Sequence, residues 1–224
     1  MKVTEEHGFD DTVRLRFQAL HSALIADSID RMGLPVQAMR HDVRPMYASA
    51  RVVGRALPIL QTAVYRQPDE PYRVLFEAFR ALRPYDVFVI TTAGHYGSGV
   101  WGGLLSTSAQ AHGAAGCVID GLTRDVHEIE EIDFPVFAVG RSAVDSEGRC
   151  EGIEWGKPID CAGARVEYGD VIVGDDMGVV VVPGEAAAEV LERAEAKQRG
   201  ETNVREILAG GADVGAVFKE HGIL

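Results

Sequence analysis

Hydrophobic residues in the first third of the chain follow the spacing of amphipathic helices and of a strand. Residues 12–32 place apolar side chains three and four positions apart, and Gly33 followed by Pro35 is a typical helix stop, so we predict one helix there. Residues 50–60 are rich in aliphatic side chains and favour a strand. Residues 71–82 open with a proline and predict a second helix.

The middle of the chain alternates between strand and helix patterns. The expected elements are strand 86–91, helix 104–112, strand 116–120, helix 124–131 and strand 135–139. Thr123 is the expected N-cap of the last helix. Because such alternation implies right-handed crossovers, we predict a largely parallel core.

The last third of the chain reads as short strands followed by helices. Strands are expected at 164–167, 171–173 and 178–182, separated by Gly-Asp turns, and helices at 185–199, 203–209 and 213–221. The region from 190 to 224 is therefore a helical tail, and its apolar face must be buried either on its own subunit or on a neighbouring one. No internal repeat or linker is visible, so we expect one domain over 1–224.

Charge and cysteine content exclude several classes of protein. The formal net charge of −12 argues against nucleic acid as a partner, because phosphate binding needs clustered basic residues. None of the three cysteines lies in a Cys-x-x-Cys pair, so neither a disulfide framework nor a thiolate zinc site is expected, and the cytoplasm is the predicted location. Residues 1–11 carry four acids and do not resemble a signal peptide, and no apolar run is long enough for a membrane span.

Candidate chemistry gathers after two of the predicted strands. Residues 93–103 follow strand 86–91, and five of these eleven residues are glycine, which lets a backbone approach a ligand closely. Residues 121–124 follow strand 116–120. If the two strands are neighbours, the N-termini of both following helices face one crevice, which suits a carboxylate or phosphate. The glycine segment is not a P-loop, because no Lys-Ser or Lys-Thr follows it.

Arg124 and Asp125 form the sharpest polar pair in the sequence. A guanidinium at a helix start clamps a carboxylate in bidentate fashion, and an adjacent aspartate holds a hard divalent cation. The alternative is an ordinary surface ion pair. His95, His112 and His127 lack the spacing of a zinc helix and are expected to be structural or exposed.

Several motifs together resemble the signature of the RraA-like family. In the family, an acidic residue is followed after twenty residues by an Arg-Asp pair. The spacing here is similar, since twenty residues separate Gly103 from Arg124. Other landmarks occur in the family order: residues 102–108, Gly113, Gly116, residues 118–121, residues 134–137, residues 145–149 and residues 175–183. The resemblance implies an α/β fold, an αββα sandwich with a mixed sheet, assembled as homotrimers or hexamers with sites at subunit boundaries.

The resemblance also implies a class II, metal-dependent aldolase of 4-hydroxy-2-oxo acids that decarboxylates oxaloacetate. Carried over to this chain, Arg124 is the catalytic residue and binds the pyruvyl part of a 2-oxo acid substrate. Asp125 binds Mg²⁺ or Mn²⁺, and Gly102, Gly103, Leu104 and Leu105 hold the substrate carboxylate through their backbone. The alternatives are a different reaction on a carboxylate substrate, and a non-catalytic regulator that binds partners like RNase E.

One position departs from the aldolases that the chain resembles. Those enzymes usually carry Asp or Glu where this chain has Gly103, and the resemblance implies that this acid orients water for proton transfer. Glycine has no carboxyl group. Three alternatives follow: another acid takes the role of the missing one, the substrate differs, or catalysis is weak.

Overall fold

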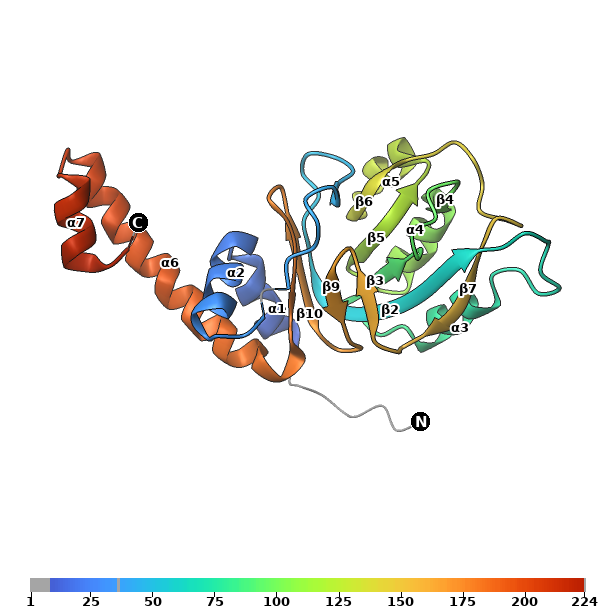
Figure 1. The fold of residues 1–224 in the computed structure, drawn as a ribbon, viewed down its shortest axis with the longest axis horizontal. Helices are drawn as coiled ribbons and strands as arrows, with labels where there is room; N and C mark the ends of the chain where they lie inside the picture. Colours follow the sequence, from blue (N-terminus) through green and yellow to red (C-terminus); the bar gives the residue numbers. More distant parts are fainter. Residues whose placement is uncertain (1–8, 36, 224) are drawn as a thin grey trace.

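A mixed β-sheet lies at the centre of the structure, a computed structural model that describes residues 9–35 and 37–223 (Figure 1). Within those residues the sheet runs β1-β6-β5-β3-β2-β10-β11, with β4 beside β5 and β7 beside β2. Strands β2 to β6 pair in parallel, and β1, β7, β10 and β11 pair antiparallel. The bounds are β1 Arg44–Pro45, β2 Val52–Ala63, β3 Asp86–Thr91, β4 Gly99–Trp101, β5 Gly116–Thr123, β6 Val136–Arg141, β7 Cys150–Trp155, β10 Val171–Asp175 and β11 Gly178–Val182, with a separate hairpin of β8 Ile159–Cys161 and β9 Ala164–Val166.

Residues 37–46 connect the two ends of this sheet. The Met39 N–H donates to the carbonyl of Val179 at 2.9 Å, and the Met46 N–H donates to the carbonyl of Val136 at 2.9 Å. Backbone bonds of this kind satisfy groups that an open edge leaves unpaired. The mixed sheet is therefore nearly closed on itself.

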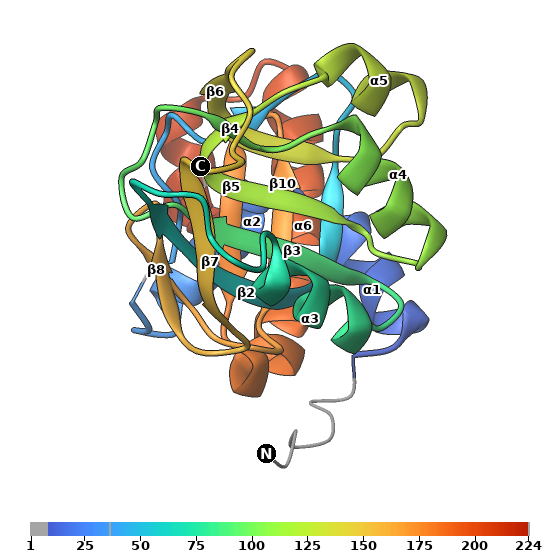
Figure 2. The same ribbon diagram turned by 90° about the vertical axis from the view of Figure 1, so that its right-hand side faces the viewer.

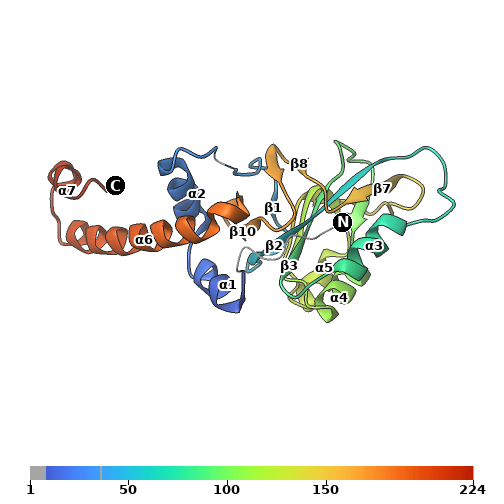
Figure 3. The same cartoon turned by 90° about the horizontal axis from the view of Figure 1, so that it is seen from below.

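Helices cover the sheet from two sides. Figures 1 and 3 show α1, α2 and α6 gathered beside β10, while α3, α4 and α5 lie at the other end of the molecule. Figure 2 is seen from the side of α3, α4 and α5, so that α2 and α6 lie behind the strands of the sheet. The bounds are α1 Asp11–Gln18, α2 Ser22–Arg31, α3 Arg73–Ala81, α4 Gly103–Ala111, α5 Val126–Glu131, α6 Ala187–Ala209 and α7 Val214–His221, with a 3-10 turn at Gly184–Ala186.

Each group of helices has its own hydrophobic core. On the side of α1, α2 and α6, Phe17, Ile25 and Leu191 pack with valines of β10 and β11. On the other side, Phe88 and Trp101 belong to a larger cluster that includes both faces of β3, whose six residues are all buried. Burial of this kind is the main favourable contribution to folding. The predicted α/β class, mixed sheet and helical tail are confirmed.

Some element boundaries differ from the sequence-based predictions. The helix expected over 12–32 is two helices, because Asp175 of β10 accepts the Ser22 N–H and starts α2 there. The helices expected at 185–199 and 203–209 are one continuous α6. The glycine-rich segment contains β4, and β1, β7 and β8 have too few apolar residues in alternation to be recognised. Thr123 does not cap α5: its hydroxyl donates to the carbonyl of Trp101 at 3.0 Å.

The end of α6 and all of α7 form an arm that extends beyond α1 and α2 (Figures 1 and 3). Within the arm, Val204 and Val217 are buried, each with 4% of its surface exposed. Val214 and Phe218 remain about half exposed, at 52% and 51%. The apolar face of the tail is thus only partly covered by its own chain. Across residues 9–35 and 37–223, no helix combines the length and apolar character that crossing a membrane requires.

Asp175 joins the sheet to α2 and is the basis of a stability prediction. The buried carboxylate accepts hydrogen bonds from the Ser22 N–H at 2.7 Å, the Ser22 hydroxyl at 2.6 Å and the Met177 N–H at 3.0 Å. Asp175→Ala leaves these three donors without their acceptor, so we expect the free energy of unfolding to fall by about 2–3 kcal/mol in urea denaturation at fixed protein concentration. The neighbouring Asp176 is exposed, and Asp176→Ala should change the free energy of unfolding by less than about 0.5 kcal/mol. Equal effects of the two substitutions would contradict this account.

Candidate functional site

Two strand ends and two helix starts meet at one edge of the sheet. β3 and β5 are parallel neighbours, as the sequence analysis required, and the missed strand β4 lies parallel to the end of β5. The Arg124 N–H donates to the carbonyl of Trp101 at 2.8 Å, which aligns the end of β4 with the end of β5. Gly102 and Gly103 therefore lie beside Arg124 and Asp125, and the predicted crevice exists.

Gly102 is glycine because the Arg124-Asp125 pair approaches its Cα closely. A Cβ on Gly102 would lie 2.6 Å from Asp125 Oδ2 and 2.8 Å from Arg124 Cγ. The N–H of Gly103, at the start of α4, donates to Asp125 Oδ2 at 3.3 Å. Asp125 itself has a left-handed backbone, with φ of 54° and ψ of 37°. This uncommon conformation turns its carboxylate toward α4 rather than toward the N–H groups of α5.

The guanidinium of Arg124 is held between two carboxylates. Its Nε lies 3.3 Å from Asp125 Oδ1, and its Nη1 lies 3.1 Å from Asp145 Oδ1. The hydrogen bond that Arg124 Nε donates to Asp125 raises the pKa of Arg124 further, so the side chain is charged at any physiological pH. The side chain of Arg124 is 35% exposed. Its guanidinium has five N–H donors, and the contacts with the two carboxylates leave some of them free for a ligand. An anionic ligand can therefore still reach it.

Glu128 occupies the space beside Gly103. A Cβ built on Gly103 would overlap Glu128 Oε2 and would lie 3.0 Å from Glu128 Cδ. The carboxylate of Glu128 thus lies where a side chain at position 103 would begin. Glu128 is three residues after Asp125, so one turn of α5 places both carboxylates at the start of α4. A carboxylate of α5 therefore lies directly beside the glycine that stands where the related aldolases carry an acid.

The family of the chain follows from a sequence comparison. The pattern of the RraA-like family, described as Aldolase/RraA, matches residues 22–181, which is more than half of the chain. The chain belongs to the RraA-like family. The resemblance drawn from residues 102–125 is confirmed.

Individual relatives agree with this membership. An uncharacterised protein of Methanocaldococcus jannaschii is 38% identical over 135 residues, which cover 60% of this chain and 64% of the relative, so the chain spans less than two thirds of it. A Halalkalibacterium halodurans protein, provisionally named 4-hydroxy-4-methyl-2-oxoglutarate aldolase, is 29% identical over 82% of each chain. A solved structure of an uncharacterised Pseudomonas syringae pv. tomato protein has a TM-score of 0.80 at 26% identity, over 93% of this chain and 98% of that one.

A hollow of about 380 Å³ opens at the site of this RraA-like chain. Its polar lining residues are Arg124, Asp125, Asp145 and Ser146, and its other large lining residues are Tyr72, Phe76, Val100, Trp101, Leu104 and Leu105. A second hollow, of about 540 Å³, shares Arg124 and Asp125 and continues past His127, Glu130 and Arg141. The first hollow contains the start of α4 and the second does not. A ligand bound by the backbone of residues 102–105 therefore lies in the first.

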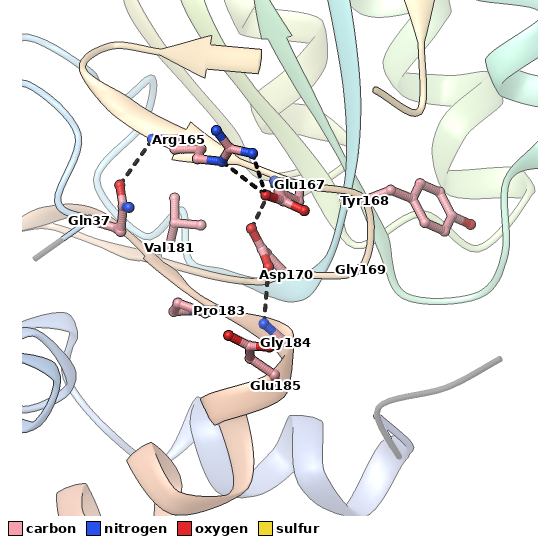
Figure 4. Close-up of a pocket in the computed structure, with 10 residues that line it drawn as sticks. All are labelled: Gln37, Arg165, Glu167, Tyr168, Gly169, Asp170, Val181, Pro183, Gly184 and Glu185. Atoms are coloured by element: carbon pink, nitrogen blue, oxygen red, sulfur yellow. Dashed lines mark hydrogen bonds and ion pairs between the residues drawn. The ribbon is translucent and has the colours of Figure 1, made fainter. Parts of the chain in front are cut away.

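Another hollow, of about 290 Å³, lies between the end of β9 and the start of the 3-10 turn (Figure 4). Its one cation is paired, since Arg165 Nη2 lies 2.8 Å from Glu167 Oε1, and Asp170 Oδ1 accepts the Gly184 N–H at 3.0 Å. Charges that neutralise each other in this way offer little to an anion or cation. The surroundings of Arg124 are the better candidate.

The histidines near the site make local contacts or are exposed, as expected. His95 Nε2 lies 2.9 Å from Ser98 Oγ, and His112 Nδ1 lies 2.7 Å from the carbonyl of Ser108. His127 is 76% exposed. The buried Ser106 hydroxyl donates to the carbonyl of Gly102 at 3.0 Å and has no adjacent base.

Glu128, Asp145, Tyr72 and Phe76 are site residues that the sequence analysis did not single out. For Glu128 the signal was available: an acid three residues after Asp125 at a helix start lies on the same face. Asp145 appeared only as a family landmark. It reaches Arg124 because the Gly99 N–H donates to the carbonyl of Val144 at 2.8 Å, a pairing between segments far apart in sequence. Tyr72 and Phe76 reach the hollow through the packing of α3, which local sequence does not encode.

Proposed function

We propose that this chain is a divalent-metal-dependent lyase that acts on a 2-oxo acid, as a pyruvate aldolase or oxaloacetate decarboxylase. One observation carries the proposal: Arg124, Asp125 and Glu128 converge on Gly102 and Gly103 at the start of α4. This arrangement combines an anion-binding helix start, a permanent cation and two carboxylates. The provisional aldolase name of the Halalkalibacterium halodurans relative supports the same reaction class.

The carboxylate of the substrate is bound at the start of α4. The first N–H groups of a helix have no partner within it, and the helix dipole is positive there. In this proposal the N–H groups of Leu104 and Leu105 hold the carboxylate. Arg124 binds its other side and stabilises the enolate charge that develops when the bond between C3 and C4 breaks.

Asp125 is the proposed anchor for a hard cation. Carboxylate oxygens suit Mg²⁺ and Mn²⁺, and Mg²⁺ is typically bound by one or two carboxylates with waters and substrate completing its shell. Within residues 9–35 and 37–223 no three His, Cys, Asp or Glu side chains form a group that could hold a metal, so in this proposal water and substrate oxygens complete the coordination of a cation at Asp125. When bound, the cation polarises the 2-oxo oxygen as a Lewis acid.

Glu128 is the proposed proton carrier in place of an acid at position 103. In retro-aldol cleavage the 4-hydroxyl proton leaves, the bond between C3 and C4 breaks, and its electron pair forms the enolate of pyruvate. A proton then returns to C3. A carboxylate beside Gly103 is placed to accept and return this proton, directly or through water.

Activity should require a divalent cation. We expect pyruvate release from oxaloacetate to stop in excess chelator and to return with Mg²⁺ or Mn²⁺, and Asp125→Asn to weaken Mn²⁺ binding in calorimetry together with turnover. Asp176→Asn, on an exposed turn, is the control. No lysine lies between Lys2 and Lys157, which argues against a Schiff base formed from the glycine segment. Full activity in chelator, or a lysine adduct trapped by borohydride, would overturn the proposal.

Glu128 should matter for turnover more than for metal binding. We expect Glu128→Gln to lower kcat by about 10²–10³-fold, since a positioned acid or base contributes that much, while Glu131→Gln on the same helix is neutral. Gly103→Asp alone should lower activity, because its Cβ overlaps Glu128 Oε2. The double variant Gly103→Asp with Glu128→Ala should regain part of the lost activity. Gly103→Asp activity above that of the native chain would show that position 128 does not replace position 103.

The assembly is proposed to be a homotrimer or a multiple of one, as the family resemblance implies. The arm of α6 and α7 leaves Val214 and Phe218 about half exposed, which supports burial against another copy. Sedimentation at micromolar concentration should give a trimer or hexamer. Phe218→Asp should shift the distribution toward smaller species, and Leu15→Asp, equally exposed on α1, should not. A monomeric native chain would refute the proposal.

A further inference from the structure

The segment between β6 and β7 carries an acid that the proposed function leaves without a role. Asp145 lies in this segment, and its Oδ1 is 3.1 Å from Arg124 Nη1. The side chain of Asp145 is 48% exposed. Exposed ion pairs contribute little to stability, so stability alone does not account for a carboxylate that lies against the cation of a ligand site.

Backbone hydrogen bonds fix this segment to the two strands that form the site. The Ser142 N–H donates to the end of β5 at 2.8 Å, and the carbonyl of Val144 accepts an N–H of β4 at the same distance. The carboxylate of Asp145 is oriented in turn, since its Oδ1 accepts the Ser146 N–H at 2.9 Å. The contact with Arg124 is therefore built on a fixed backbone rather than on two freely moving side chains.

Three contacts hold the side chain of Arg124 along its length. Its aliphatic part lies against Gly102, where a Cβ would come within 2.8 Å of Arg124 Cγ. Its Nε lies 3.3 Å from Asp125 Oδ1, and its Nη1 faces Asp145. Because Nε and Nη1 lie on different edges of the planar guanidinium, the two carboxylates together fix its rotation as well as its place.

A cation at Asp125 would change the balance between these two carboxylates. A carboxylate oxygen that coordinates a cation is a weaker acceptor for Arg124, and the cation itself repels the guanidinium. Asp145 contacts the other edge of the guanidinium and keeps its charge for Arg124. Of the two contacts, the one with Asp145 is therefore the one that a bound cation leaves in place.

We propose that Asp145 is a positioning residue, which holds the guanidinium of Arg124 in the orientation that receives the carboxylate of a 2-oxo acid while Asp125 binds the cation. The inference rests on the proposed function for the roles of Arg124 and Asp125. Asp145 and Arg124 belong to the same chain, so their contact does not depend on what a neighbouring subunit adds to the hollow.

Two substitutions at position 145 separate the anchoring of Arg124 from the effect of charge. Asp145→Asn and Asp145→Ala remove the same negative charge, but only asparagine keeps an oxygen that accepts an N–H of the guanidinium. With Mn²⁺ present, calorimetry should find pyruvate bound about fivefold more weakly by Asp145→Ala than by Asp145→Asn, because an unanchored side chain must be immobilised when the ligand binds. If Asp145 contributed only its charge, both variants would bind pyruvate equally, and more tightly than the native chain.

Turnover should follow the same order. We expect kcat for oxaloacetate decarboxylation to fall by about tenfold in Asp145→Ala and by no more than about threefold in Asp145→Asn, since a displaced guanidinium stabilises the enolate less well. Asp42→Ala is the control: Asp42 is 40% exposed and lies 3.2 Å from Arg40 Nε, a comparable ion pair outside the hollow. Asp42→Ala should leave pyruvate binding and kcat unchanged.

A double-mutant cycle distinguishes positioning of Arg124 from support of the segment that carries Asp145. Asp145 also accepts the Ser146 N–H, so its loss could loosen this segment. Arg124→Lys keeps a positive charge but has no planar guanidinium to orient. In that background the difference in pyruvate binding between Asp145→Ala and Asp145→Asn should fall below about twofold. A fivefold difference that persists would show that Asp145 does not act through Arg124. Circular dichroism and the oligomeric state of each variant show that it is folded.

The outcomes separate this inference from the proposed function. Weaker pyruvate binding by Asp145→Ala than by Asp145→Asn, without pyruvate release from any 2-oxo acid, refutes the lyase and leaves the positioning role standing. Metal-dependent pyruvate release by the native chain with equal pyruvate binding by the two variants supports the lyase and overturns the inference. A native chain that does not bind pyruvate in the presence of Mn²⁺ overturns both.

Discussion

The carbonyl oxygen of Trp101 accepts two hydrogen bonds from the end of β5, from the Arg124 N–H at 2.8 Å and the Thr123 hydroxyl at 3.0 Å. The indole of the same residue is 1% exposed and donates to Ser106 Oγ at 2.8 Å, inside α4. One buried residue thus ties β4, β5 and α4 together. Because these contacts fix where β4 ends, Gly102 comes to lie against the Arg124-Asp125 pair. The geometry of the site depends on this arrangement.

That geometry concentrates negative charge. Asp125 and Asp145 both contact Arg124, so two carboxylates lie against one guanidinium, and a third, Glu128, lies beside Gly103. Their combined field opposes the binding of an anionic 2-oxo acid, and the helix start offsets only part of it. A divalent cation reverses the local balance. The charges of the site therefore favour the proposed metal dependence, as the coordination chemistry of a carboxylate does.

The sequence predicted the parallel core and the crevice because both depend on local patterns: the buried strand 86–91, the glycine-rich segment after it, and Arg124 after the next strand. It did not predict β4 or the break between α1 and α2. Both depend on distant partners, Thr123 and Asp175 respectively. Glu128 was predictable from helical spacing. Phe76 was not, since only the packing of α3 on β7 brings it to the site.

The contact between Glu128 and Gly103 bears on the shape of the site. The Glu128 carboxylate fills the volume next to Gly103, and the first turn of α4 bears no polar side chain before Ser106. Leu104 is left 86% exposed, facing a hollow that Phe76 also lines. The start of α4 thus contributes backbone groups and apolar side chains to the hollow. In the proposed function the proton carrier then belongs to α5 and the carboxylate-binding backbone to α4, and Asp125, which accepts the Gly103 N–H, joins the two.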